Sequence, residues 1–225
     1  MKCLFCQSKI TSEVTWRTLF YPTPMSICKL CNHSLTVISG ARCSRCSRRS
    51  DVPKCIDCLQ WEQFPARDTL RYNYSIYQYN ECMQEIITKW KYRGDYELGY
   101  IFKNAFHTHF QKMMLTAAKT HLAIPIPLSV ERQVERGFNQ AEMLAQFLPI
   151  PKAPYLQRVT SEKQATKTRS ERMGSANPFQ LRKPINKPII LVDDIYTTGT
   201  TLRHAAKVLI EHGCPEVISF TLIRS

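Results

Sequence analysis

The chain has 225 residues, with 31 Lys or Arg against 18 Asp or Glu, so its formal net charge is +13. This length allows one sizeable hydrophobic core and a small additional module. The basic excess is weak evidence on its own, but it favours polyanionic partners such as nucleic acids, nucleotides and phosphates. No segment approaches about 18 consecutive apolar residues, and the first residues lack the long apolar core of a signal peptide. We therefore expect a cytoplasmic protein with no membrane span.

Ten cysteines in a reducing compartment are typical of metal ligands rather than of disulfides. Eight of them form four C-x-x-C pairs: Cys3/Cys6, Cys28/Cys31, Cys43/Cys46 and Cys55/Cys58. Two residues between thiolates bring both sulfurs within reach of one tetrahedral Zn²⁺ ion. We expect the pairs to combine in chain order into two structural four-cysteine zinc sites. A cross-braced combination and redox chemistry of the C-x-x-C pairs are the alternatives.

The expected domain boundary follows the last cysteine pair. Residues 1–60 are predicted to form the zinc-ribbon module and residues 61–225 the second domain, with a linker at 59–68. Four arginines surround the third cysteine pair: Arg42, Arg45, Arg48 and Arg49. They either contact a nucleic-acid backbone or remain solvated.

The second domain is predicted to be a doubly wound α/β fold, because strand–loop–helix transitions recur along it. Residues 69–79 alternate aromatic with polar side chains and predict a strand, with a stacking platform for single-stranded bases as the alternative. The further expected elements are helices at 80–90 and 96–116, a strand at 122–127, a helix after Gly137, and a last strand at 217–223.

The stretch 189–201, I-I-L-V-D-D-I-Y-T-T-G-T-T, combines a strand, two acids and a Thr/Gly turn. Its four leading apolar residues predict a strand that is buried on both faces. Leu202, Ala205 and Leu209 then recur at helical spacing, so the turn precedes a helix N-terminus, which favours anions. A Walker B strand also ends in Asp, but it requires a G-x-x-x-x-G-K-[ST] loop, which the chain lacks.

This stretch resembles the phosphoribosyl pyrophosphate (PRPP) signature of type I phosphoribosyltransferases. The resemblance implies that Asp193 and Asp194 bind the ribose hydroxyls of PRPP together with Mg²⁺. It further implies that the 5′-phosphate lies in a loop made by Thr197, Thr198, Gly199, Thr200 and Thr201.

Basic residues elsewhere are expected at the pyrophosphate end of the ligand. Arg132 and Arg136 follow the strand at 122–127, at the carboxyl edge of the predicted sheet. Residues 158–175 contain almost no apolar side chains and are predicted to form a mobile basic loop over pyrophosphate, the alternative being a solvated linker. Four loop residues complete this predicted site: Lys163, Lys167, Arg169 and Arg172.

The whole chain is similar to the ComF family of competence-associated proteins. The matching segments are the tandem C-x-x-C pairs, K-Y-R-G-D at 91–95, E-R-G-F-N-Q-A at 135–141, T-R-S-E-R at 168–172 and the signature at 189–201. The resemblance implies a type I phosphoribosyltransferase-like parallel sheet flanked by helices, preceded by a small N-terminal double zinc ribbon.

The resemblance also implies a function in DNA uptake for natural transformation. A ComF-like protein is expected to bind single-stranded DNA and PRPP, and to work with an ATP-driven DNA translocase of the same operon. The alternative is an active phosphoribosyltransferase that serves nucleotide metabolism or salvage with an unidentified acceptor. No acceptor-base site and no general base stand out in the sequence, so no residue is assigned as catalytic.

Overall fold

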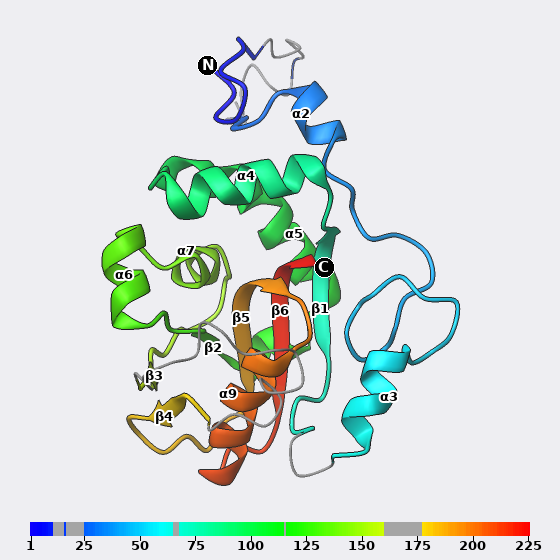
Figure 1. The fold of residues 1–225 in the computed structure, drawn as a ribbon, viewed down its shortest axis with the longest axis vertical. Coiled ribbons are helices and arrows are strands. Elements are labelled where there is room, and N and C mark those ends of the chain that lie inside the picture. The colour runs from blue at the N-terminus through cyan, green and yellow to red at the C-terminus, as the bar shows by residue number, and fades with distance from the viewer. Residues whose placement is uncertain (11–15, 17–24, 65–67, 115, 160–176) are drawn as a thin grey trace.

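The computed structural model describes residues 1–10, 16, 25–64, 68–114, 116–159 and 177–225 (Figure 1). Its centre is a four-stranded parallel sheet in the order β1-β6-β5-β2. The strands are β1 (Asn73–Gln78), β2 (Leu122–Pro125), β5 (Ile189–Tyr196) and β6 (Val217–Arg224). A separate antiparallel ribbon joins β3 (Leu156–Arg158) to β4 (Phe179–Leu181).

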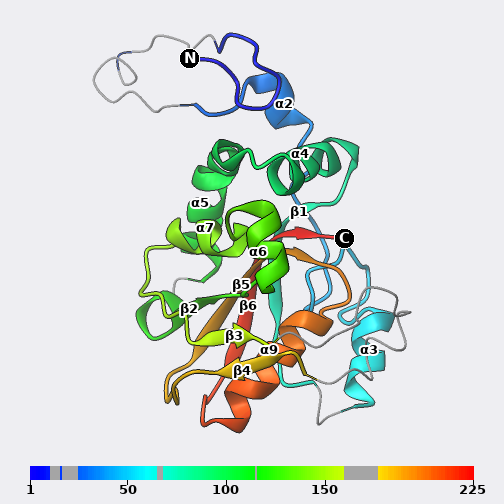
Figure 2. The same cartoon turned by 60° about the vertical axis from the view of Figure 1, so that its left-hand side comes forward.

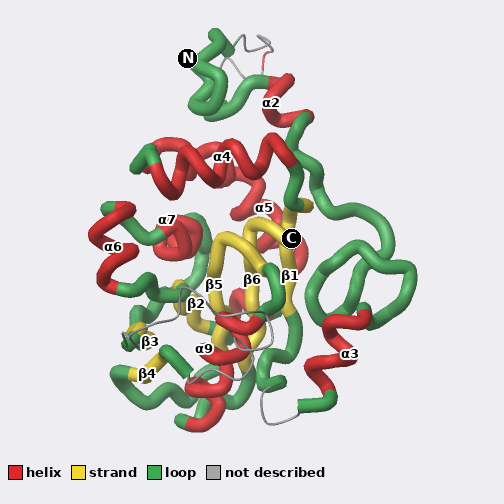
Figure 3. Tube along the Cα trace, in the orientation of Figure 1, coloured by secondary structure: helices red, strands yellow, loops and turns green. Residues whose placement is uncertain are grey.

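The described helices flank this sheet and the cysteine-rich segments (Figures 1 and 3). The α-helices are α2 (Lys29–His33), α3 (Ile56–Glu62), α4 (Glu81–Tyr92), α5 (Lys103–Met113), α6 (Val130–Arg136), α7 (Gln140–Gln146) and α9 (Thr200–Glu211). Two 3₁₀ segments are η1 (Tyr96–Phe102) and η2 (Ala117–Lys119). In the described part of the chain, no helix is long and apolar enough to cross a bilayer.

The sheet is buried on both faces, as the unbroken apolar run of β5 predicts. Successive side chains of a strand point to opposite faces. Ile190 and Val192 accordingly join the core under α4, α5 and α7, whereas Ile189 and Leu191 join the core under α9. Figure 2 shows these two helical layers on either side of the strands. The expected fold class, a parallel sheet flanked by helices, is confirmed.

The cysteine-rich N-terminal part of the chain consists of two segments that lie at different places on the molecule. Residues 1–10 and α2 lie above α4, and the segment that carries α3 runs beside β1 (Figures 1 and 2). The second segment is joined to the outer edge of β1 by hydrogen bonds from Ile38 N–H to Ile76 O (2.8 Å) and from Gln78 N–H to Thr36 O (2.9 Å).

Three local expectations were wrong in part. Residues 59–62 belong to α3 rather than to a linker, and Trp61 is buried. The expected helix at 96–116 is η1 followed by α5, with Gly99 of η1 packed closely against Met143 and Trp90. Residues 130–136 form the short helix α6, where a loop was expected. The basic loop predicted at 158–175 lies almost entirely outside the described residues.

Candidate functional site

The signature lies at a point where neighbouring strands send their connections to opposite faces of the sheet. After β5 the chain continues into α9 on one face, and after β2 it continues through α6 into α7 on the other. β2 and β5 are hydrogen-bonded neighbours. In open parallel sheets such a switch point leaves a crevice at the carboxyl ends of the strands, which is where ligands bind.

The two acids of the signature are held close together at the end of β5. Asp194 N–H donates to Asp193 Oδ1 at 2.9 Å. Asp194 is buried and forms an ion pair with Lys91, which reaches it from the last turn of α4. Lys91 is the first residue of the K-Y-R-G-D segment, but nothing in the sequence alone places it beside Asp194. Lys91 thus adds a cation to the candidate site, and only the fold shows that it lies there.

Burial raises the pKa of Asp193 above its ordinary value, and the neighbouring Asp194 carboxylate raises it further. Lys91 acts in the opposite direction and lowers the pKa of Asp193. The pair therefore favours a bound cation, because a cation relieves the repulsion that raises the pKa of Asp193. Mg²⁺ prefers oxygen ligands such as carboxylates, and carboxylates also accept hydrogen bonds from ribose hydroxyls. The donor set therefore fits a Mg²⁺-bound sugar phosphate.

The Thr/Gly loop turns directly into α9, a helix of 12 residues. Gly199 has a left-handed backbone (φ +79°), and any side chain there would collide with Arg203 and Tyr196. Thr198 Oγ1 lies 2.9 Å from Thr200 Oγ1, which brings two hydroxyl donors together. The first-turn N–H groups of a helix lack intrahelical acceptors and carry the positive end of its dipole. The loop is therefore suited to a phosphate.

Two further elements bring arginines to this part of the molecule. Arg132 is exposed on α6, and Arg158 ends β3 within electrostatic reach of Asp193 and Arg132. Burial and then Arg132 lower the pKa of Arg158, whereas Asp193 raises it. Arg158 was not singled out from the sequence, although it begins the basic segment. The other predicted pyrophosphate ligands, Lys163, Lys167, Arg169 and Arg172, lie outside the described residues.

The two motifs K-Y-R-G-D and E-R-G-F-N-Q-A meet beside the acids. The Arg136 guanidinium lies 5.6 Å from the centre of the Tyr92 ring, so it is partly engaged with α4. The Phe138 ring packs edge-on against Tyr96 at 5.1 Å. Asn139 caps α7 by accepting from Ala141 N–H and donates its own amide to a loop carbonyl after β2. These contacts hold α6 and the end of α4 over the crevice.

The eight paired cysteines form two groups, as expected from chain order. The first group is Cys3, Cys6, Cys28 and Cys31, and the second is Cys43, Cys46, Cys55 and Cys58. Within each group all four sulfurs lie within 4.8 Å of one another. Zn²⁺–S bonds of about 2.3 Å in a tetrahedron place the sulfurs about 3.8 Å apart. The distances of 3.7 Å for Cys6–Cys28 and 3.6 Å for Cys46–Cys55 fit a zinc ion.

The first turns of both groups have the same backbone geometry. The N–H of Gln7 bonds to Cys3 O at 2.9 Å, and the N–H of Ser47 bonds to Cys43 O at 3.0 Å. Both Gln7 and Ser47 adopt positive φ, which is uncommon for residues other than glycine. The same strained turn at two cysteine pairs supports one shared role, that of holding two thiolates on one ion.

Most of the four arginines around the third cysteine pair are engaged within the protein. Arg42 donates to Ile38 O at 2.5 Å, Arg45 pairs with Asp68, and Arg48 pairs with Asp57. Arg49 is the exposed member of the set. The tyrosines of β1 are likewise internal, since Tyr74 and Tyr77 are buried. These observations weaken the interpretation of either set as a nucleic-acid surface.

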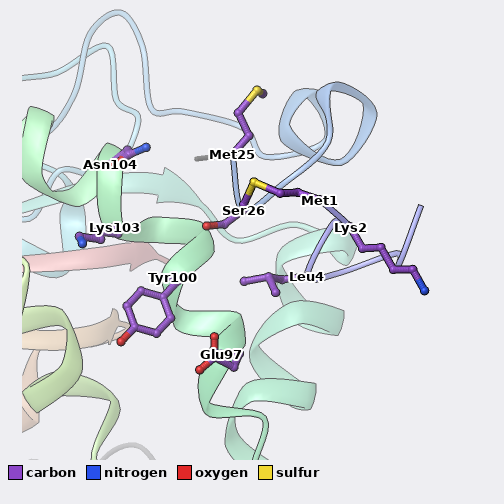
Figure 4. A pocket seen from close by; sticks show the side chains of 9 residues that line it. All are labelled: Met1, Lys2, Leu4, Met25, Ser26, Glu97, Tyr100, Lys103 and Asn104. Carbon is purple, nitrogen blue, oxygen red and sulfur yellow. The ribbon is translucent and has the colours of Figure 1, made fainter. Parts of the chain in front are cut away.

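A hollow of about 330 Å³ lies between the N-terminal residues and the η1–α5 turn (Figure 4). Leu4, Tyr100 and Lys103 are among the residues that line it. No signature residue is among the described residues of its wall. It is therefore separate from the crevice at β5.

Comparison with known proteins agrees with this geometry. A sequence model of the phosphoribosyl transferase domain matches residues 135–225, which include the signature. The competence protein ComFC of Bacillus subtilis is 43% identical over 99% of this chain and 95% of its own length. ComFC of Streptococcus pneumoniae is 30% identical over the full length of both chains. The DNA utilization protein YhgH of Escherichia coli K12 is 25% identical over 90% of this chain and 99% of its own length. A parallel sheet with the PRPP signature, two four-cysteine groups and full-length similarity to two ComFC proteins show that this chain belongs to the ComF family.

Proposed function

We propose that this protein serves competence for DNA uptake and that its phosphoribosyltransferase-like domain binds PRPP with Mg²⁺. The relatives named as competence or DNA utilization proteins support the first part. One observation carries the second part: two adjacent carboxylates, Asp194 buried and Asp193 partly buried, meet a Thr/Gly helix N-terminus at the switch point of the sheet.

Each part of the ligand has a chemically matched partner in the proposed site. The 5′-phosphate is received by the 197–201 loop, where N–H groups and hydroxyls donate hydrogen bonds. Asp193 and Asp194 accept from the ribose hydroxyls and hold Mg²⁺, which neutralises the negative charge of the pyrophosphate. Arg132 and Arg158 supply cations for the pyrophosphate oxygens, with Lys163, Lys167, Arg169 and Arg172 as further expected ligands.

Neutralising both acids tests the site directly. The double variant Asp193→Asn/Asp194→Asn should weaken Mg²⁺–PRPP binding by about a hundredfold or more, because two charge-assisted interactions are lost. Calorimetric titration measures the affinity, and metal analysis shows that the zinc content is unchanged. A matched variant with two exposed acids away from the site replaced, Asp51→Asn/Glu211→Gln, should bind normally. Equal affinity of the double variant and the wild type would refute the assignment.

Single-stranded DNA and an ATP-driven DNA translocase are the proposed macromolecular partners. Titration with single-stranded DNA and with Mg²⁺–PRPP, separately and together, shows whether the two ligands compete, cooperate or act independently. Binding to the DNA backbone should weaken with salt, with a logarithmic slope of about 0.7 per phosphate contact. A salt-independent affinity would argue against a phosphate-reading surface.

Phosphoribosyl transfer is a second candidate function, favoured by the match of residues 135–225 to the phosphoribosyl transferase domain. In that reaction pyrophosphate leaves C1 of the ribose as an acceptor attacks, and the arginines near the acids stabilise the leaving group. Release of pyrophosphate from PRPP that depends on an added base or on DNA would establish turnover. Binding without release would leave the site as a ligand sensor.

A further inference from the structure

The second cysteine group is joined to the phosphate loop through a buried tryptophan. Trp61 lies three residues after Cys58 on α3, and both side chains are buried. The indole Nε1–H of Trp61 donates to Thr198 O at 3.0 Å. One helical turn and one hydrogen bond thus connect Cys58, an expected zinc ligand, to the phosphate loop.

That hydrogen bond controls the direction of a neighbouring donor. The peptide between Thr198 and Gly199 is trans, as are all described peptides. In a trans peptide the C=O and the N–H point in opposite directions. Because Trp61 holds the Thr198 carbonyl, it also directs the Gly199 N–H away from α3. The direction of that N–H is what a phosphate-binding turn depends on.

The Arg203 side chain packs under the same loop and is held there by three contacts. Its guanidinium lies 4.4 Å from the centre of the Trp61 ring, donates to Tyr196 Oη at 2.6 Å and pairs with Asp68. Arg203 is only 1% exposed. Gly199 rests directly on this layer, since any side chain there would collide with Arg203 and Tyr196. The loop conformation therefore depends on Trp61 and Arg203 staying in place.

A second connection starts from another cysteine of the same group. The Arg224 guanidinium lies 3.7 Å from Cys46 Sγ and 4.9 Å from the centre of the Tyr196 ring. Arg224 also donates to Tyr196 O at 3.3 Å. Cys46 and Cys58, from different C-x-x-C pairs, thus connect to the loop by two routes, one through Tyr196 just before it and one through Thr198 within it.

We propose that the second four-cysteine group, through Trp61, holds the phosphate loop in its binding conformation, so that metal at this group strengthens binding of the 5′-phosphate. Four thiolates on one ion fix α3, and α3 fixes the Thr198 carbonyl. Coupling of this kind is reciprocal, so the phosphate ligand strengthens metal binding at the second group by the same factor. The identity of the ligand rests on the proposed function, whereas the coupling itself does not.

Amide hydrogen exchange of residues 196–203 tests the coupling without any ligand. The zinc-loaded variant Trp61→Phe keeps a ring under Arg203 but loses the N–H donor, and it should exchange faster in this segment than the wild type. The double variant Cys55→Ser/Cys58→Ser should do the same. Two controls should exchange like the wild type: Trp16→Phe, at a side chain that is 82% exposed, and Cys3→Ser/Cys6→Ser in the first group.

Binding of ribose 5-phosphate then measures the effect on the site. Loss of one hydrogen bond that orients the loop should weaken ribose 5-phosphate binding by Trp61→Phe about threefold to tenfold. Inorganic pyrophosphate, which does not require this loop, should bind within twofold of the wild-type affinity. A loss of affinity for ribose 5-phosphate alone would indicate that Trp61 positions the loop. A general loss of stability would weaken the binding of both ligands.

Three results would overturn the proposal. One is wild-type exchange and wild-type ribose 5-phosphate affinity in Trp61→Phe. Another is an equal effect of both cysteine double variants, which would indicate only a general destabilisation. The third is equal weakening of ribose 5-phosphate and pyrophosphate binding. If Cys55→Ser/Cys58→Ser does not fold, Trp61→Phe decides alone. If the wild type binds neither PRPP nor ribose 5-phosphate, the proposed function fails and the exchange data still decide the coupling.

Discussion

Asp193 and Lys91 give the site its electrostatic character. A buried carboxylate beside a second one is costly, and this cost appears as the raised pKa of Asp193. Lys91 lowers the cost by pairing with Asp194 in the absence of other cations. A Mg²⁺-bound ligand brings its own positive charge, so it relieves the same repulsion. The site would thereby suit the proposed ligand, which brings a Mg²⁺ ion to the two carboxylates.

Removing Lys91 should shift the pH dependence of ligand binding. Lys91 lowers the pKa of Asp193, so the variant Lys91→Met should raise that pKa further. In the proposed site Mg²⁺–PRPP binds the ionised carboxylate, so the midpoint of binding should move to higher pH. Affinity measured by calorimetry across a pH series reports the midpoint.

Lys89 offers a matched control for this variant on the same helix. It pairs with Glu85 at 2.7 Å, four residues earlier, and not with the signature. Lys89→Met should therefore leave the midpoint unchanged. A midpoint that does not move in Lys91→Met, or that moves equally in both variants, would contradict the role assigned to Lys91.

At the scale of elements, the sequence predicted those whose apolar pattern is strong. The helix at 80–90 was predicted from Met83, Ile86, Ile87 and Trp90, all of which are buried in α4. The helix α6 was missed because none of its side chains is buried, so it has no apolar period to detect. It is defined instead by its ends, since the Ser129 hydroxyl caps its first turn and Gly137 adopts the left-handed conformation.

Gly99 lies where η1 packs most closely against its neighbours, the side chains of Met143 and Trp90. A β-carbon at this position would collide with the sulfur of Met143 and the ring of Trp90. Gly99→Ala should therefore lower the free energy of unfolding by about 1–3 kcal/mol, as overpacked core substitutions do. Denaturant unfolding measures this loss. Glu97→Ala, at an exposed position of the same segment, should change stability little, and equal stability of both variants would argue against the close packing.

The site was predictable only where it is local in sequence. One stretch of sequence contains Asp193, Asp194 and the 197–201 loop, so their chemistry can be inferred without knowing the fold. Lys91 and Trp61 join the site through tertiary contacts, and Trp61 is 137 residues from its partner Thr198. A single sequence contains no signal for such a contact. The elements had to be placed in space before either residue acquired a role.

At the scale of the whole molecule, the two cysteine groups differ in how deeply their side chains are buried. All four cysteines of the second group are buried, whereas Cys6 of the first group is exposed and Cys28 and Cys31 are partly exposed. The second group also belongs to the same apolar core as β5 and α9. The predicted boundary at residue 60 thus divides a segment whose later part packs against the second domain.

Zinc should therefore leave the protein in two steps. A chromogenic chelator is expected to remove one equivalent quickly, from the less buried first group, and the second slowly, because the protein must open to expose it. The variant Cys3→Ser/Cys6→Ser should lack the fast step and retain the slow one. Release of both equivalents at one rate, or loss of the slow step in this variant, would contradict this order.

The backbone contacts along the outer edge of β1 have a consequence for biosynthesis. Residues 36–38 occupy that edge, where an unpaired strand would otherwise offer its N–H and C=O groups to another chain. Aggregation through exposed edges is a general hazard of newly made sheets. A chain synthesised without enough metal to order its cysteine-rich segment would leave this edge open. If zinc fills the four-cysteine groups, as we expect, its supply during translation should affect how much of the newly made protein aggregates, apart from any effect on the ligand site.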